Sequence, residues 1–377
     1  MTADNDSKAA ARHPVFVRDA TYESGRLDAV ISELLDASGL DVQGRSVLLK
    51  PNILGPFEVE RAITTHPAVV RAVVGNLKRR GARVMVGDNP GMRGYGENVL
   101  SAKRCGIYDA CPGEFVNLSE QPTFVPTRSR FIRQLLVPQR ALEADLLITL
   151  PKFKTHLVTT LTGAVKNSFG LLVGGQKSEI HRLARSNRHF CEAVVDVYQV
   201  RVPDLAIMDA ITGMQGMGPS SDDLLDVGKV MACRNAVTLD AVMAMMMGAQ
   251  PEAVTTLSVA HERGLGEIRR DRIEVDGRWG PIPGFKLPFG HMRGVISTAL
   301  ARLFTYIMVK RPVVDREVCR RCGLCAKQCP VEAITLSPYP VIDTEKCFSC
   351  FCCHEFCKYN AVRVTRTVRF LRRIIDH

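Results

Sequence analysis

Between residues 15 and 285, short apolar runs alternate with segments in which apolar residues recur every three or four positions. The short runs predict buried strands, and the helical spacing predicts helices. The predicted strands are 46–53, 82–91, 145–151, 204–211 and 229–233, and the predicted helices are 66–80, 98–109, 160–172, 191–200, 238–248 and 251–264. This alternation predicts an α/β domain over residues 15–285, with a mainly parallel sheet and helices on both faces.

The segments outside this domain have other patterns. Residues 1–14 lack an apolar stretch behind a basic region, so we expect a disordered leader and not a secretory signal. Residues 279–288 are rich in Pro and Gly, which predicts a linker, and apolar residues at helical spacing predict an amphipathic helix over 295–308. Residues 286–311 are therefore expected to form a linker and an amphipathic helix.

Residues 366–377 form a basic amphipathic tail, in which arginines are interspersed with Val, Leu and Ile. We expect this tail and the amphipathic helix to dock on the α/β domain, with an anionic membrane surface or a partner protein as the alternatives. No apolar run reaches the roughly 18 residues that a spanning helix needs. The sequence predicts a cytoplasmic protein, located at the inner face of the membrane if these segments bind lipid.

The formal net charge of the chain is +11. Such a charge suits an acidic protein, an anionic substrate, an anionic membrane surface or nucleic acid. Aromatic residues make up only 6% of the chain, and it has no zinc-finger or RNA-binding signature. We therefore expect no nucleic-acid partner. The composition leaves the oligomeric state open.

The cysteines are the most informative residues, because nine of the thirteen lie between Cys319 and Cys357. They form two runs with the same spacing, in which two-residue gaps are followed by a three-residue gap. The first run is Cys319, Cys322, Cys325 and Cys329, and the second is Cys347, Cys350, Cys353 and Cys357. One such run would also suit zinc, but two in tandem predict two [4Fe–4S] clusters. Cys105, Cys111, Cys191 and Cys233 are scattered and are expected to be core or surface thiols.

This region resembles the two-cluster bacterial ferredoxins, which implies a small α+β ferredoxin-like domain over residues 312–365. The resemblance implies that Cys319, Cys322, Cys325 and Cys357 bind cluster I, and that Cys347, Cys350, Cys353 and Cys329 bind cluster II. Residues 331–346 predict a hairpin, and residues 361–364 repeat the pattern of 333–336. Lys358 departs from the usual Pro, and Cys352 is an additional thiol, expected to be a small buried residue or else an alternative ligand.

The charge of this domain bears on its partner. Residues 312–365 contain seven Lys and Arg against six Asp and Glu, whereas freely diffusing ferredoxins are usually strongly acidic. We therefore expect the domain to serve its own chain or an acidic electron donor.

Polar and glycine-rich segments follow the predicted strands of the α/β domain, at the edge where ligands bind in such sheets. Lys152, Lys154, His156 and Lys166 are the candidate catalytic residues. With Lys50, Lys177, His66 and His181 they make a cation-rich set that would hold a carboxylate or phosphate, and solvated surface lysines are the alternative. Asp88, Asp209 and Asp240 are candidate proton donors, metal ligands or helix caps, and Asp240 is expected to be structural. The glycines of 213–219 lack a phosphate-loop pattern, so we expect no nucleotide.

Several of these segments resemble the family of unknown function DUF362. The resemblance rests on Lys50-Pro51-Asn52, Thr64-Thr65-His66-Pro67, the Lys152–His156 and Leu161–Gly170 segments, and Asp209 leading into Gly213–Pro219. Many members of this family carry a C-terminal ferredoxin-like domain, so the resemblance implies an iron–sulfur redox protein. Residues 220–223 depart from the glycine-containing turn that the family pattern implies.

Three functions fit the sequence. The first is an iron–sulfur oxidoreductase that passes electrons from its two [4Fe–4S] clusters to an anionic small molecule in the α/β domain. The second is an electron-transfer adaptor whose α/β domain docks a partner enzyme, and the third is a cluster or metal maturation factor. Each requires an electron donor or acceptor protein, or a protein that receives the cluster.

Overall fold

The computed structural model describes residues 13–91, 97–184, 186–288 and 308–368. The chain divides into two units, Met1–Leu287 and Pro288–His377. Most of the expected leader, the amphipathic helix up to residue 307 and the tail from residue 369 onward lie outside the described residues. In the part of the chain that the structure covers, no helix is both long and apolar enough to cross a membrane.

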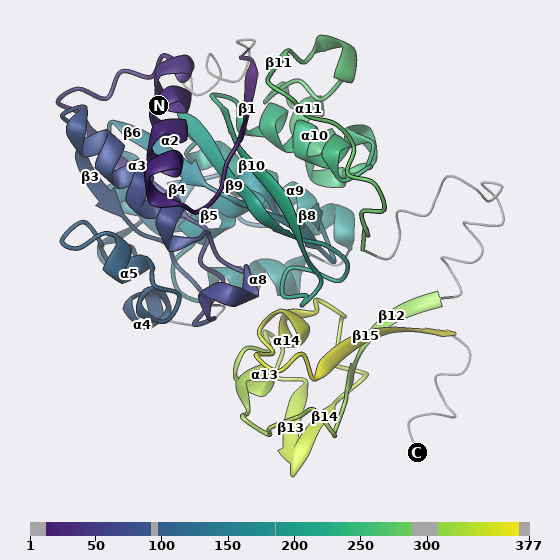
Figure 1. Cartoon of the computed structure of the whole chain (residues 1–377). Helices are drawn as coiled ribbons and strands as arrows, with labels where there is room; N and C mark the ends of the chain where they lie inside the picture. Colours follow the sequence, from purple (N-terminus) through teal and green to yellow (C-terminus); the bar gives the residue numbers. More distant parts are fainter. Residues whose placement is uncertain (1–12, 92–96, 185, 289–307, 369–377) are drawn as a thin grey trace. The chain divides into compact units, whose positions relative to one another are not determined.

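The first unit is built on a nine-stranded, mainly parallel sheet, which confirms the predicted α/β class (Figure 1). The central strands β2, β3, β6 and β9 run parallel, and β7 is also parallel to β9. β10 pairs antiparallel with both β9 and β1. The strands are β1 Val15–Asp19, β2 Ser46–Pro51, β3 Arg83–Val86, β6 Leu146–Leu150, β7 Lys152–His156, β8 Thr160–Leu161, β9 Leu205–Met214, β10 Leu224–Cys233 and β11 Val275–Asp276, with a separate hairpin of β4 Pro122–Pro126 and β5 Gln134–Pro138.

Helices cover both faces of this sheet, because alternate strand residues point to opposite faces. In β9, Leu205 and Ile207 join one apolar cluster with α2 and α3, whereas Ala206 and Met208 join another with α9, α10 and α11. The helices are α2 Ser24–Ser38, α3 Pro67–Arg79, α4 Glu97–Arg104, α5 Ile107–Ala110, α6 Gln139–Glu143, α7 Gly163–Asn167, α8 Gln176–Leu183, α9 Asn187–Val200, α10 Ala236–Met246 and α11 Thr255–Glu262. Both faces of the sheet are thus filled by apolar side chains.

Three predicted helices differ from the structure. The segment 98–109 forms two helices, because Gly106 has a φ of 72° and interrupts the helical backbone. The segment 160–172 is divided among β8, α7 and a 3-10 turn at Ser168–Leu171. The segment 251–264 begins with a 3-10 turn at Pro251–Ala253, and α11 starts only after the extended Val254. Each of these breaks depends on local backbone conformation that apolar periodicity does not encode.

The predicted linker over residues 279–288 was wrong for most of its length. Trp279, Ile282, Phe285 and Leu287 pack against the apolar cluster on the α9–α10 face. The backbone of Lys286 also donates a hydrogen bond of 2.9 Å to Gln215 Oε1. This segment is therefore part of the first unit.

The second unit is a small α+β domain with an internal repeat of 28 residues. β12 Met308–Val314 pairs with β15 Val362–Val368, and β13 Ile334–Ser337 forms the predicted hairpin with β14 Tyr339–Ile342. The N–H of Asp315 donates a hydrogen bond to Ala361 O at 2.7 Å. The N–H of Asp343, its equivalent in the repeat, donates to Ala333 O at 2.7 Å. The short helices α13 Leu324–Lys327 and α14 Cys352–Glu355 repeat at the same interval.

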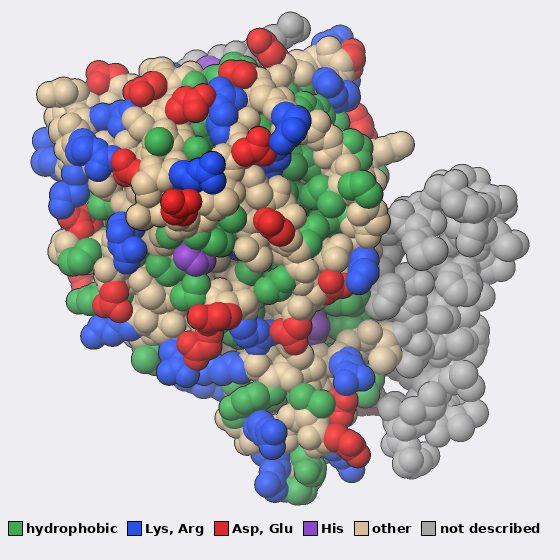
Figure 2. Space-filling model, viewed as in Figure 1, with side chains coloured by type: hydrophobic (Ala, Val, Ile, Leu, Met, Phe, Trp, Pro, Cys, Tyr) green, Lys and Arg blue, Asp and Glu red, His purple; other side chains and the backbone are tan. Residues whose placement is uncertain are grey.

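The surface of the first unit carries charges of both signs. Figure 2 shows Lys and Arg side chains interspersed with Asp and Glu over the visible face, without one extended basic area. On this face, the positive net charge is therefore spread out.

Candidate functional site

The eight cysteines of the two runs lie in two equivalent loops of the second unit, each ending in a short helix. Burial, followed by the neighbouring thiols of Cys357, Cys322 and Cys319, raises the pKa of the Cys325 thiol to about 11. The first three cysteines of the first run and the last cysteine of the second run are therefore neighbours.

The other four thiols form a second group. Burial raises the pKa of Cys347, and the neighbouring thiols of Cys350 and Cys329 act in the same direction. Burial also raises the pKa of Cys353, whose neighbours include Cys350, Cys347 and Cys329. Cys325 of the first group is another neighbour of Cys353, so the two groups adjoin.

Backbone N–H groups point at several of these sulfurs. Ala333 N lies 3.2 Å from Cys329 Sγ, and Ala361 N makes the equivalent 3.2 Å contact with Cys357 Sγ. Arg321 N donates to Cys319 Sγ at 3.4 Å. Such donors stabilise thiolates that bind iron and tune the potential of a cluster. All thirteen cysteines are free thiols, so disulfides do not compete for these ligands.

Cys352 lies beside the second group and is fully buried. It occupies the position that Leu324 has in the first half of the repeat, which accords with its expected role as a small buried residue. Its Sγ lies within 4.8 Å of Cys350 Sγ. A hydrogen bond from the Cys352 thiol is the main cause that lowers the pKa of Cys350.

The scattered cysteines Cys105, Cys111, Cys191 and Cys233 are all buried in the first unit, so they are core thiols and not surface ones. Burial raises the pKa of Cys105 to about 11, which keeps its thiol protonated.

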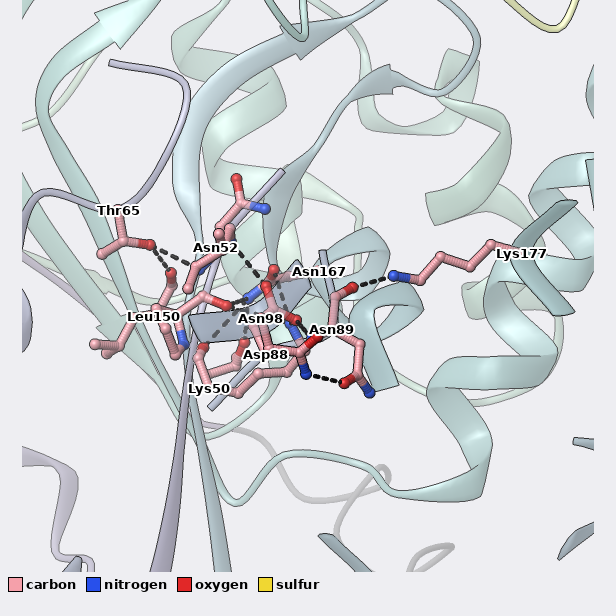
Figure 3. A network of polar contacts seen from close by, with 12 residues as sticks. Lys50, Asn52, Thr65, Asp88, Asn89, Asn98, Leu150, Asn167 and Lys177 are labelled. Atoms are coloured by element: carbon pink, nitrogen blue, oxygen red, sulfur yellow. Dashed lines mark hydrogen bonds and ion pairs between the residues drawn. The ribbon is translucent and has the colours of Figure 1, made fainter. Parts of the chain in front are cut away.

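In the first unit, the ends of β2 and β3 bring Lys50 and Asp88 together in a buried ion pair of 2.7 Å (Figure 3). Burial lowers the pKa of Lys50, and the pairing with Asp88 opposes that shift. Lys50 Nζ also donates to Asn167 Oδ1 at 3.2 Å, and Asp88 Oδ2 accepts from Ile53 N–H at 2.7 Å. These contacts fix both members of the pair, and Figure 3 shows Asn167 beside Lys50 and Asp88.

The Leu161–Gly170 segment ends in a glycine because the Lys50–Asp88 pair leaves no room for a side chain there. A Cβ atom at this position would clash with Asp88 Oδ1 and Lys50 Nζ. Lys177 joins the same region, because its Nζ donates to the backbone carbonyls of Asn89 and Gly91.

A second buried ion pair joins Lys152 Nζ and Asp209 Oδ2 at 2.8 Å. Lys152 Nζ also donates to Tyr22 Oη at 2.9 Å, and the Tyr22 hydroxyl donates to Asp209 Oδ1 at 3.0 Å. The backbone of His66 donates to Asp209 Oδ2 at 2.8 Å. Burial lowers the pKa of Lys152, and Asp209 opposes that shift.

His66 is the partly exposed member of this group of Tyr22, Lys152 and Asp209. Its ring stacks on Tyr22 with centroids 3.7 Å apart, and its Nδ1 accepts the N–H of Ala68 at 3.1 Å. An acceptor at Nδ1 assigns the ring proton to Nε2. Burial lowers the pKa of His66, which favours this neutral form. His66 can therefore offer an N–H donor while Lys152 holds a charge behind it.

The other candidate residues have separate surroundings. Lys154 is buried in β7 and donates to Ile63 O at 2.6 Å. His156 Nδ1 accepts Val158 N–H at 3.1 Å within a tight turn. Lys166 is half-buried over the rings of Phe169 and Phe190, at 5.4 and 5.8 Å. The ring of His181 lies 4.4 Å from that of Phe190.

Asp240 caps a helix, in line with the expectation that it is structural. Its two carboxylate oxygens accept the N–H groups of Ala164 and Val165 at 2.7 and 2.9 Å, in the first turn of α7. Burial nevertheless raises its pKa to about 7. Gly163 leaves room for this carboxylate, because a Cβ there would clash with it.

Sequence reasoning missed Tyr22 and the buried β7. Tyr22 lies between β1 and α2, just after a strand that the sequence did not predict, and no local pattern distinguishes it. The alternation Lys-Phe-Lys-Thr-His follows a strand and suggested a polar loop, yet all five residues are buried in the sheet. The contact between Asn167 and Lys50 could have been anticipated, because Asn167 lies in Leu161–Gly170, one of the segments that carry the family resemblance.

Comparisons with known proteins match the first unit and the second unit to two different families. Residues 47–245 match the family model of a domain of unknown function, DUF362, and residues 312–335 match a 4Fe-4S binding domain. The second unit therefore contains a 4Fe-4S binding domain, and the matched residues include the first cysteine run.

A lactate racemase apoprotein from Thermoanaerobacterium thermosaccharolyticum is a distant structural neighbour, with 11% identity and a TM-score of 0.37. The similarity covers 60% of this chain, and the chain spans 54% of the racemase, so it supports no functional argument.

A curated relative, the thylakoid-associated protein sll1697 of Synechocystis sp., is 31% identical over 263 residues. The match covers 66% of this chain and 79% of the relative. The DUF362 match covers more than half of the chain. The chain belongs to the DUF362 family.

Proposed function

We propose that this protein is an iron–sulfur oxidoreductase with two [4Fe–4S] clusters, which passes electrons to an anionic small molecule bound in the α/β unit. The observation that carries the proposal is the pair of free-thiol groups, built by a 28-residue repeat around adjoining sites. Cysteine thiolates in this spacing hold [4Fe–4S] clusters, which supply single electrons when bound.

The neighbours of each thiol support the assignment of ligands. Cluster I would bind Cys319, Cys322, Cys325 and Cys357, because the first, second and fourth of these surround Cys325. Cluster II would bind Cys347, Cys350, Cys353 and Cys329, which are neighbours in the same way. The N–H groups of Ala333 and Ala361 would stabilise one thiolate of each cluster.

In the α/β unit, Lys152 is the candidate catalytic residue with the best-defined surroundings. Its charge is held by Asp209 and Tyr22, and the stacked His66 is partly exposed beside them. A carboxylate or phosphate would accept a hydrogen bond from His66 Nε2, because Nδ1 already accepts the N–H of Ala68. Lys154, His156 and Lys166 remain proposed contacts of the substrate.

Membrane contact is a further part of this proposal. The curated relative is described as thylakoid-associated, and the chain carries a net charge of +11. We infer a peripheral contact with an anionic membrane surface. Co-sedimentation with vesicles rich in anionic lipid, against neutral vesicles, tests it, and equal recovery with both would contradict it.

The oxidoreductase proposal is tested with anaerobically purified protein reduced by dithionite. Small carboxylates and phosphates are then screened for one that reoxidises the clusters, followed by their visible absorbance. We expect at least one anion to accelerate reoxidation in the native protein and not in His66→Leu. Lys286→Ala, which alters an exposed ion pair with Asp223, is the matched control.

Two results would contradict the oxidoreductase proposal. If no anion oxidises the clusters but a redox partner protein does, the chain is an electron-transfer adaptor. If the clusters instead move to an apo-protein acceptor, the chain is a maturation factor.

A further inference from the structure

The two cysteine loops of the second unit share a backbone. Arg321 and Ser349, which are 28 positions apart, both have a positive φ, at 53° and 59°. Gly323 and Phe351 are also equivalent, with φ values of 73° and 63°. Because the backbones agree, side chains at equivalent positions can be compared directly.

The side chains of these loops differ strongly in charge. Residues 315–329 contain four Lys and Arg against two Asp and Glu, which gives a net charge of +2. Residues 343–357 contain one Lys against three Asp and Glu, which gives −2. The arginines Arg316, Arg320 and Arg321 have Thr344, Phe348 and Ser349 as their counterparts.

The arginines of the first loop surround an exposed ligand. Arg316, Arg320, Arg321 and Cys322 are all exposed. The guanidinium groups of Arg316 and Arg321 lie over the Tyr339 ring, at 5.8 and 5.6 Å from its centroid. These stacking contacts hold two of the charges in place on the surface.

An apolar side chain lies beside this group. Leu336 is 47% exposed, and a Cβ on Gly323 of the first loop would lie 3.2 Å from its Cδ1. Protein docking surfaces combine a small apolar centre with charged side chains at the rim. We name Arg316, Arg320, Arg321, Cys322, Leu336 and Tyr339 the first-loop face.

We propose that the first-loop face docks an acidic one-electron carrier protein, of the flavodoxin or ferredoxin kind, which reduces cluster I. This inference rests on the proposed function, since it requires cluster I to be bound. One electron leaves the reduced carrier and converts [4Fe–4S]²⁺ to [4Fe–4S]⁺, and no proton or chemical group moves. The positive rim steers an acidic carrier to the face, and the exposed Cys322 shortens the path to the cluster.

The test uses the full, cluster-loaded protein and an acidic flavodoxin reduced to its hydroquinone. Stopped-flow absorbance follows the flavin semiquinone left by transfer of one electron. The variants are Arg320→Glu, and Arg316→Thr combined with Arg321→Ser, which introduces the residues of the second loop. Lys346→Glu makes the same reversal as Arg320→Glu, but in the second loop, where Lys346 is also exposed.

We expect the native second-order rate to fall steeply as salt is added, because exposed charges are screened. At low salt, the second-order rate of each first-loop variant should be at least about tenfold lower than the native rate, since rim charges act on association. Lys346→Glu should stay within about twofold of the native rate, since Lys346 belongs to the second loop and is not part of the first-loop face. Reduction by dithionite should be equal in all four proteins.

Equal rates for native protein and first-loop variants would overturn the proposal. An equal loss in Lys346→Glu would overturn it too, because net charge and not the first-loop face would then govern the rate. Failure of the proposed function looks different. If no anion reoxidised the clusters, the rates of reduction by the carrier would be unaffected, and if the clusters were absent, native protein would lack iron and would not be bleached by dithionite.

Discussion

The two units differ in what holds them together. The α/β unit buries apolar side chains on both faces of its sheet, in two large clusters. The second unit, which we call the cysteine unit, has a main apolar cluster of only eight buried residues. Four of these are Cys325, Cys329, Cys353 and Cys357. A core of that size does not stabilise a domain without metal or disulfides. The comparison indicates that the α/β unit folds by apolar burial and the cysteine unit folds around its metal.

Removal of iron is expected to have the largest effect. Chelation under oxidising conditions, with the thiols then kept reduced, should unfold the cysteine unit, because metal binding supplies its folding free energy. Hydrogen exchange should show lost protection in the β12–β15 pair and retained protection in β2, β6 and β9. The fluorescence of Trp279, the only tryptophan, should stay native because it packs on the α/β unit. Persisting protection of β12–β15 would contradict this account.

Asp209→Ala should have the next largest effect, and only on the α/β unit. It leaves the Lys152 ammonium buried without this carboxylate, which costs about 3–5 kcal/mol in the free energy of unfolding. Urea unfolding followed by Trp279 fluorescence measures this. In the control Lys286→Ala, the ion pair is exposed and its loss should cost less than about 1 kcal/mol. Similar losses in both would show that burial of the pair is unimportant.

Asp240 should give the α/β unit a pH dependence. Its pKa is raised to about 7 in the folded protein, from 3.8 in an exposed side chain, because it is buried. Between these values the folded state keeps a proton that the unfolded chain releases. The free energy of unfolding therefore falls as pH rises through this range, by on the order of 3 kcal/mol.

The matched variant for this prediction is Asp240→Asn, which cannot titrate. The free energy of unfolding is measured with urea from about pH 4.5 to about pH 7.5. It should show this decrease in the native protein and not in the variant. Parallel pH profiles for the two proteins would rule out the assignment, whatever their difference in absolute stability.

The cysteine unit could be predicted in more detail than the α/β site, for a physical reason. Its ligands lie within one short stretch, so residue spacing alone dictates the loops and the repeat. Tyr22 and Asp209 are 187 positions apart, and only the folded sheet brings them together. The strand-end rule did bring Lys50 near Asp88, but it did not reveal that both are buried and paired.

Cys352→Ala should have the smallest effect and separates two roles of this thiol. As a buried neighbour it leaves both clusters in place, so the iron content should be unchanged. Loss of the hydrogen bond to Cys350 should move one cluster to a more negative potential, because that bond stabilises the added electron. Potentials are read from a redox titration followed by electron paramagnetic resonance. Loss of half the iron would instead make Cys352 a ligand.

Every functional proposal above requires the eight thiols of the cysteine unit to hold two [4Fe–4S] clusters. The decisive measurement is the content of iron and acid-labile sulfide in anaerobically purified full-length protein. We expect about eight iron atoms and eight sulfides per chain, falling to about four of each in Cys319→Ala. About four of each in the native protein would contradict the second cluster, and zinc without sulfide would contradict both.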